Sequence, residues 1–109
     1  MKRICYTLNL KNNKTLIKEY INHHKNVWPE IIKSMKDSGI VNAEIYNFST
    51  RLFLLIEVDE TFSEKRKKEL DKKNKFVNDW EEMMLKYQEL IPNSPNGEKW
   101  VKMNKIFQL

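Results

Sequence analysis

Both histidines of the chain lie in one segment, residues 20–30, that also holds a tyrosine, a tryptophan and a proline. Imidazole can give and take a proton near neutral pH because its ordinary pKa is about 6.5. His24 stands four residues after Tyr20 and four before Trp28, so a continuous helix would place all three side chains on one side. His23 is rotated away from that side. The spacing therefore favours His24 as an acid/base group with aromatic neighbours.

Each of these residues also has a structural interpretation. His24 could hydrogen-bond within the core, and Tyr20 could be an amphipathic tyrosine at the core edge. Trp28 could anchor the chain where Pro29 disturbs the helix, because the proline ring clashes with the carbonyl four residues earlier. A second helical piece is expected to begin at Pro29 and to end at Gly39. Spacing alone leaves the structural and functional roles both open.

The apolar pattern predicts the elements that position this segment. Alternation favours strands, and apolar residues at steps of three and four favour amphipathic helices. The resulting order of strand, helix, strand, strand, helix, strand predicts one α+β domain over residues 1–109, with a ferredoxin-like antiparallel sheet and helices on one face. The expected ranges are strand 2–10, helical residues 14–39 with the break at Pro29, hairpin strands 40–48 and 52–58, a helical region from Thr61 or Ser63 to Leu90, and strand 101–109.

Helices can cover only one face of such a sheet. The other face is expected to carry large apolar groups, so self-association or a pocket would have to cover it. The residues expected there are Tyr6, Leu8, Tyr46, Leu54 and Phe107.

Composition narrows the class of protein. The net charge of +5 comes from 20 basic and 15 acidic residues. The basic run at residues 65–75 is interleaved with acidic side chains, which is typical of a solvated helix face, and RNA-binding motifs are absent, so no nucleic-acid partner is expected. One cysteine excludes an internal disulfide framework. With neither a signal peptide nor a membrane span, we expect a cytoplasmic protein.

The chain contains the run Tyr20-x-x-x-His24-x-x-x-Trp28-Pro29-Glu30, followed by Gly39, Asn42, Ile45-Tyr46, Arg51-Leu52-Phe53, Trp80 and Phe107-x-Leu109. In this combination it resembles the L-rhamnose mutarotase family over essentially its whole length. The resemblance implies a ferredoxin-like homodimer whose two sheets form a joint α/β barrel. It also implies an isomerase that interconverts the α and β pyranose anomers of a 6-deoxy-hexose. L-Rhamnose is the expected monosaccharide, and L-fucose, the sugar of related members, is the alternative.

The resemblance assigns the proton-donor histidine to His24 and matches Trp80 to a tryptophan of the family's substrate pocket. The hydroxyl of Tyr20 could bind a sugar hydroxyl or ring oxygen, and Trp28 could stack on the C–H face of a deoxysugar. Trp80 could instead belong to the core. Mutarotation protonates the ring oxygen while the anomeric hydroxyl loses its proton, so it requires neither metal nor cofactor. A positioned acid/base group typically accelerates such a reaction by about 10²- to 10⁴-fold.

Two positions depart from the rhamnose-type pattern. Ala43 stands where relatives tend to place a sugar-contacting tyrosine, and Asp79 stands where they have the first of two adjacent tryptophans. The first change removes a hydroxyl and a ring, and the second offers a possible hydroxyl acceptor. Both bear on which sugar binds. Two other classes stay open: a non-catalytic dimeric domain that binds a small ligand, and the cofactor-free oxygenases or haem-degrading enzymes that share this architecture.

Overall fold

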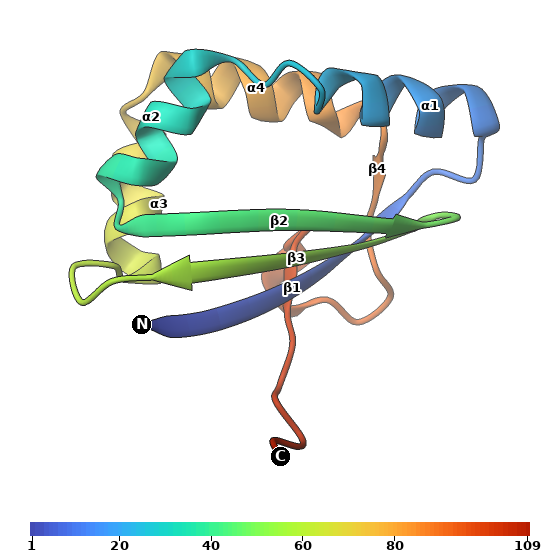
Figure 1. The fold of residues 1–109 in the computed structure, drawn as a ribbon. Helices are drawn as coiled ribbons and strands as arrows, with labels where there is room; N and C mark the ends of the chain where they lie inside the picture. Colours follow the sequence, from blue (N-terminus) through green and yellow to red (C-terminus); the bar gives the residue numbers. More distant parts are fainter.

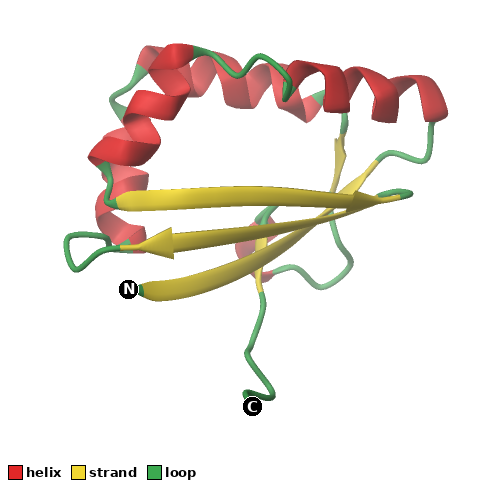
Figure 2. Cartoon of the chain, in the orientation of Figure 1, coloured by secondary structure: helices red, strands yellow, loops and turns green.

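The first strand, β1 (Lys2–Leu10), is the centre of an antiparallel sheet in the computed structural model, which describes residues 1–109 (Figures 1 and 2). It pairs with β3 (Arg51–Val58), which pairs in turn with β2 (Ile40–Phe48) at one edge. On its other side β1 pairs with two short strands, β4 (Gln88–Glu89) and β5 (Val101–Lys102). The strand order β2-β3-β1-β4 confirms the predicted ferredoxin-like α+β fold.

The helices cover one face of this sheet. In Figure 1, α1 (Lys14–His23) and α4 (Lys75–Leu85) run above the strands. Helices α2 (Pro29–Asp37) and α3 (Glu64–Lys72) descend toward the end of the sheet where β2 begins and β3 ends. No helix combines the length and the apolar character that crossing a membrane requires.

The second helical region is divided, where one continuous helix was predicted. Helix α3 ends at Lys72, and α4 starts after Asn74, whose side chain accepts hydrogen bonds from the backbone N–H groups of Phe76 and Val77 at 3.0 and 3.3 Å. Asparagine in this position satisfies donors that a helix start leaves unpaired. The new start lets α4 change direction and place its apolar stripe over the sheet.

The predicted last strand, residues 101–109, is wrong beyond Lys102. After the backbone N–H of Met103 bonds to the carbonyl of Cys5, the chain leaves the sheet, and Phe107 is 75% exposed. A strand needs a neighbour for its backbone groups, and alternation of apolar residues cannot show that no neighbour is present. The two-residue strand β4 was not predicted.

Strand register decides which apolar side chains face the helices. Leu8 pairs with Leu52, and Tyr6 pairs with Leu54. All four side chains point to the face that the helices cover, and Leu8 is fully buried. The expectation that Tyr6, Leu8 and Leu54 lie on the face away from the helices is therefore wrong. That surface, called the uncovered face below, is formed by the alternate residues, and on it the rings of Tyr46 and Phe53 lie 6.1 Å apart. Its apolar members are Cys5, Tyr46, Phe48, Phe53, Leu55 and Val101.

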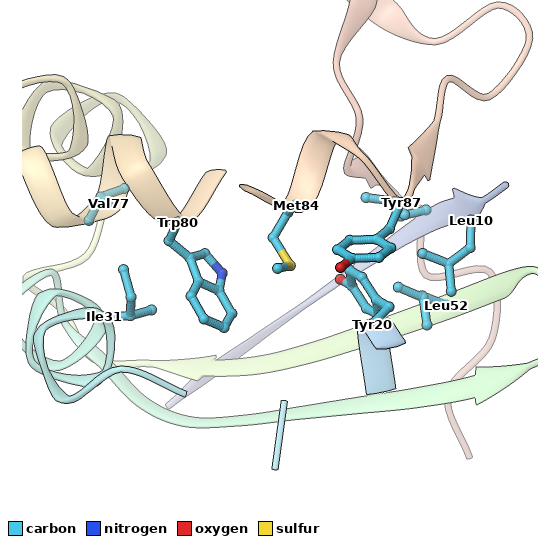
Figure 3. Close-up of a cluster of buried hydrophobic side chains, with 9 residues drawn as sticks. Leu10, Tyr20, Ile31, Leu52, Val77, Trp80, Met84 and Tyr87 are labelled. Carbon is cyan, nitrogen blue, oxygen red and sulfur yellow. The ribbon is translucent and has the colours of Figure 1, made fainter. Parts of the chain in front are cut away.

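Two apolar clusters lie between the sheet and the helices, and the larger one carries the candidate site (Figure 3). The smaller cluster lies near the start of β2 and consists of Ile4, Ile40, Ile56 and Val58. The larger cluster joins sheet, α1, α2 and α4 through Leu8, Leu10, Tyr20, Ile31, Leu52, Val77, Trp80, Met84 and Tyr87.

Candidate active site

Helix α1 stops one turn earlier than the spacing predicts. His24 caps its C-terminus with φ −81° and ψ −6°, and residues 25–28 form a bridge to α2. Trp28 is extended, with ψ 136°, because a residue before proline is disfavoured in the helical region. The predicted continuous helix through Tyr20, His24 and Trp28 is therefore wrong. Pro29 does begin the second helix, as predicted.

The predicted residues nevertheless meet, through packing on α4. The imidazole of His24 lies 4.5 Å from the ring of Tyr20 and 5.6 Å from that of Trp80, measured between centroids. Trp28 folds back onto Trp80, with centroids 5.2 Å apart and planes at 76°. Figure 3 shows Trp80 projecting from α4 toward the sheet, between Ile31 and Met84. Tyr20, His24, Trp28 and Trp80 are called the aromatic cluster below.

The hydrogen bonding of His24 fixes which nitrogen is available. Its Nδ1 lies 2.9 Å from the carbonyl oxygen of Tyr20, which can only accept, so Nδ1 carries the hydrogen. No group of the chain bonds to Nε2. In the neutral ring, Nε2 therefore has a free lone pair that can accept a proton and later return it.

The protonation state of His24 follows from its surroundings. Burial lowers its pKa below the ordinary 6.5, because the charged form loses hydration. The carbonyl of Tyr20 acts in the opposite direction by accepting a hydrogen bond, and the charge of His23 lowers the pKa further. His24 is therefore mainly neutral at pH 7.

Tyr20 is the most enclosed member of the aromatic cluster, with 3% of its surface exposed. Burial raises its pKa to about 12, so its hydroxyl keeps its proton at neutral pH. The hydroxyl can donate to or accept from a sugar hydroxyl, while the ring supports His24. Trp80 is also buried, and His24 and Trp28 are partly exposed.

The two positions expected to influence the choice of sugar, Ala43 and Asp79, make no contact with the aromatic rings of His24, Tyr20 or Trp28. Ala43 is half-buried on β2 opposite Ile56, on the helix-covered face, and packs on the smaller core cluster. Asp79 is exposed, whereas Trp80 beside it is buried. The carboxylate of Asp79 makes no hydrogen bond or ion pair within the chain. The chain by itself therefore brings neither Ala43 nor Asp79 together with His24.

Sequence reasoning missed Tyr87 as a neighbour of the site. Its hydroxyl lies 3.0 Å from Nε2 of His23 and its ring centroid 6.0 Å from that of Tyr20. The apolar stripe of the second helical region predicted that Tyr87 is buried, but no local signal links it to residues more than sixty positions earlier.

The chain is similar in sequence to known proteins over nearly its whole length. Residues 3–109 match the family model described as L-rhamnose mutarotase. An L-fucose mutarotase from Xanthomonas campestris pv. campestris is 35% identical over 111 residues, covering 100% of this chain and 89% of the relative. A UPF0734 protein from Dictyostelium discoideum is 34% identical over 115 residues, covering 99% of this chain and 90% of the relative.

The fold also matches a solved structure. The crystal structure of an L-rhamnose mutarotase from Formosa agariphila superposes with a TM-score of 0.73 at 20% identity, covering 100% of this chain and 99% of that one. The family model and the relatives extend this likeness from the fold to the sequence. The chain belongs to the L-rhamnose mutarotase family, whose members are sugar isomerases.

Proposed function

We propose that this protein interconverts the α and β pyranose anomers of a 6-deoxy-hexose, with L-rhamnose as the substrate and L-fucose as the alternative. The observation that carries the proposal is the imidazole of His24, whose free Nε2 belongs to a mainly neutral ring within the aromatic cluster. Family membership supplies the reaction class.

In the proposed reaction, His24 exchanges a proton with the reacting oxygens of the sugar. Ring opening moves one proton off the anomeric hydroxyl and one onto the ring oxygen while the bond from C1 to that oxygen breaks. Rotation about the bond between C1 and C2 then lets the ring close on the other face. Closure reverses opening, so one imidazole with a pKa below 6.5 can donate in one direction and accept in the other.

The aromatic cluster supplies a surface suited to a deoxysugar. The C–H groups and the C6 methyl of such a sugar are apolar and pack well against indole rings. Trp28 is partly exposed, and its contact with Trp80 fixes the orientation of its indole. The hydroxyl of Tyr20 would bond to a sugar hydroxyl.

The choice between L-rhamnose and L-fucose rests on hydroxyl positions, since the two sugars differ in configuration at C2 and C4 and share the methyl group. We propose that Ala43 and Asp79 contribute to this choice. Ala43 lacks the hydroxyl and the ring that a tyrosine would bring to the helix-covered face, and Asp79 offers an exposed carboxylate.

The test is anomer exchange measured by saturation-transfer NMR, with L-rhamnose and L-fucose as substrates and D-galactose as the control sugar. We expect exchange above the buffer rate with one or both deoxysugars, and its loss in His24→Ala. If His24→Ala exchanges anomers as fast as the parent protein, His24 is not the catalyst. If the parent itself matches the buffer rate, a non-catalytic binding domain becomes the better description.

We also propose that the protein works as a homodimer joined through the uncovered face. Phe48 on this face is 85% exposed and Tyr46 is 55% exposed, which is unusual for aromatic side chains that lie in one sheet surface. The segment after Lys102 adds further apolar surface, because Ile106 is 95% and Phe107 75% exposed. A second copy of the chain would cover both regions at once.

Sedimentation velocity tests this assembly. Phe48→Glu should convert a dimer to a monomer because it places a charge in the contact. Phe76→Glu is the matched control, since Phe76 is 49% exposed on α4, away from the uncovered face. A parent protein that sediments as a monomer at all concentrations would contradict the proposed dimer.

A further inference from the structure

A second hydrogen-bond network reaches the last turns of α1. The hydroxyl of Tyr87 donates to Oε1 of Glu19 at 3.1 Å and lies 3.0 Å from Nε2 of His23. Tyr87 follows the end of α4 and is only 4% exposed. Its ring also contacts that of His23, with centroids 5.5 Å apart, and that of Tyr20 edge to face at 6.0 Å. One buried tyrosine therefore holds two residues on successive turns of α1.

This network determines the tautomer of His23. An ionised carboxylate only accepts, so the hydroxyl hydrogen of Tyr87 goes to Glu19. The hydroxyl oxygen must then accept from His23, which places the hydrogen of the neutral His23 ring on Nε2. His24 carries its hydrogen on Nδ1. The two adjacent histidines are thus held in opposite tautomers.

The end of α1 depends on such side-chain contacts. Helix α1 makes few close backbone approaches to other elements, and Figure 1 shows it reaching the far end of the helical layer. At its C-terminus, the backbone N–H groups of His24 and Lys25 bond to the carbonyls of Ile21 and Asn22 in 3₁₀-type bonds. Helix ends held in this way fray readily unless packing prevents it.

We propose that Tyr87 is a positioning residue for the reaction at His24: through Glu19 and His23 it docks the last turns of α1, and so keeps His24 in contact with Tyr20 and Trp80. This inference rests on the proposed mutarotase function for its catalytic consequence. Lys86 supports the network from the end of α4, with Nζ 3.5 Å from Oε1 of Glu19 and 5.5 Å from the centroid of the Tyr87 ring. That pair is largely exposed and contributes little by itself.

Tyr87→Phe is the direct test, because it keeps the ring and removes the hydroxyl. We expect kcat for anomer exchange to fall about 10-fold while KM changes less than about twofold, since a misplaced acid/base group slows the chemical step. Tyr6→Phe is the matched control: the hydroxyl of Tyr6 also donates to a glutamate, Glu64, at 3.0 Å, but beside the smaller core cluster. This control should keep the parent kcat.

Imidazole ¹⁵N spectra give a second measurement that does not depend on activity. The chain has two histidines, and His24→Ala assigns their signals. Tyr87→Phe should turn the His23 signal from the Nε2–H form into a mixture of tautomers. An unchanged His23 signal, or an unchanged kcat, overturns the proposal.

Two substitutions of Glu19 complete the test without altering the core, since its side chain is 41% exposed. Glu19→Ala should reproduce the effects of Tyr87→Phe, whereas Glu19→Gln should largely restore the parent values because an amide oxygen still accepts from the hydroxyl. Equal rates in both variants would overturn the proposal. Parent protein without anomer exchange would instead overturn the proposed function, while the His23 spectra would still decide whether Tyr87 sets the tautomer.

Discussion

The imidazole of His24 stands edge to face against the indole of Trp80, with planes at 77° and centroids 5.6 Å apart. The two residues come from the end of α1 and the middle of α4. This contact contributes to the burial that lowers the pKa of His24, and the same indole also holds Trp28. Trp80 therefore links the imidazole of His24 to the indole of Trp28.

Replacing Trp80 should alter both stability and titration. Trp80→Ala should lower the free energy of unfolding by about 3–5 kcal/mol, as other large deletions in cores do. In the protein that remains folded, the pKa of His24 should rise toward 6.5 because water reaches the ring. Denaturant unfolding and NMR titration measure the two effects. Phe76→Ala on the exposed side of α4 is the control and should change neither by much.

The pH dependence of the proposed activity should follow the lowered pKa of His24. Above pH 6.5 the ring is neutral in the folded and unfolded states, so kcat/KM should be flat. Below 6.5 the unfolded chain takes up the proton more readily than the folded one. The contribution of neutral His24 to the free energy of unfolding is therefore fully present above pH 6.5. It is lost as the pH falls through the pKa that His24 has in the folded protein. An acid limb with a midpoint at or above 6.5 in the pH profile of kcat/KM would contradict this account.

Position 43 should influence the choice of sugar without affecting proton transfer. Ala43→Tyr restores the residue of the rhamnose-type pattern and should raise the preference for L-rhamnose over L-fucose, by about 10-fold in the ratio of kcat/KM if one new hydrogen bond forms. Ala43→Phe is the matched control, since it adds the ring alone. If both variants give the same ratio, the hydroxyl is not what discriminates. The acid limb of the pH profile should be the same in all three proteins.

Gly39 ends α2 in a conformation that only glycine adopts easily, with φ +101°. A Cβ at this position would lie 2.7 Å from both Oδ1 of Asp59 and Oγ1 of Thr61. Gly39→Ala should therefore lower the free energy of unfolding by about 1–3 kcal/mol. Gly97 also has positive φ, +68°, but a Cβ there would meet nothing within 4 Å. Gly97→Ala separates backbone strain from collision, and equal losses would show that the collision is unimportant.

Local patterns were sufficient for much of the fold. Alternation predicted β1, which has one more buried and one more exposed side, and the Ile, Val, Leu, Tyr and Phe residues on either side of a polar turn predicted β2 and β3. Pro29 and Gly39 each restrict or permit a particular backbone conformation at their own position, so they located the two ends of α2 correctly. These are the features whose causes lie within a few residues.

Features that depend on contacts between residues far apart in the chain could not be predicted from local sequence patterns. Beyond Lys102 the tail lacks a neighbouring strand, and the contact of Tyr87 with His23 joins residues far apart in the chain. The aromatic cluster was predicted from a helical spacing that does not exist past His23. His24 and Trp28 meet because both pack on Trp80, a residue that the resemblance to the family suggested and helical spacing did not.

The early end of α1 separates two tasks that one straight helix would have combined. His24 is attached to the carbonyl of Tyr20, whereas Trp28 belongs to the four-residue bridge and leans on Trp80. A change in the length of that bridge would swing the indole away and leave the imidazole anchored. In the proposed mechanism, contact with the sugar and exchange of its proton can therefore be altered independently by mutation.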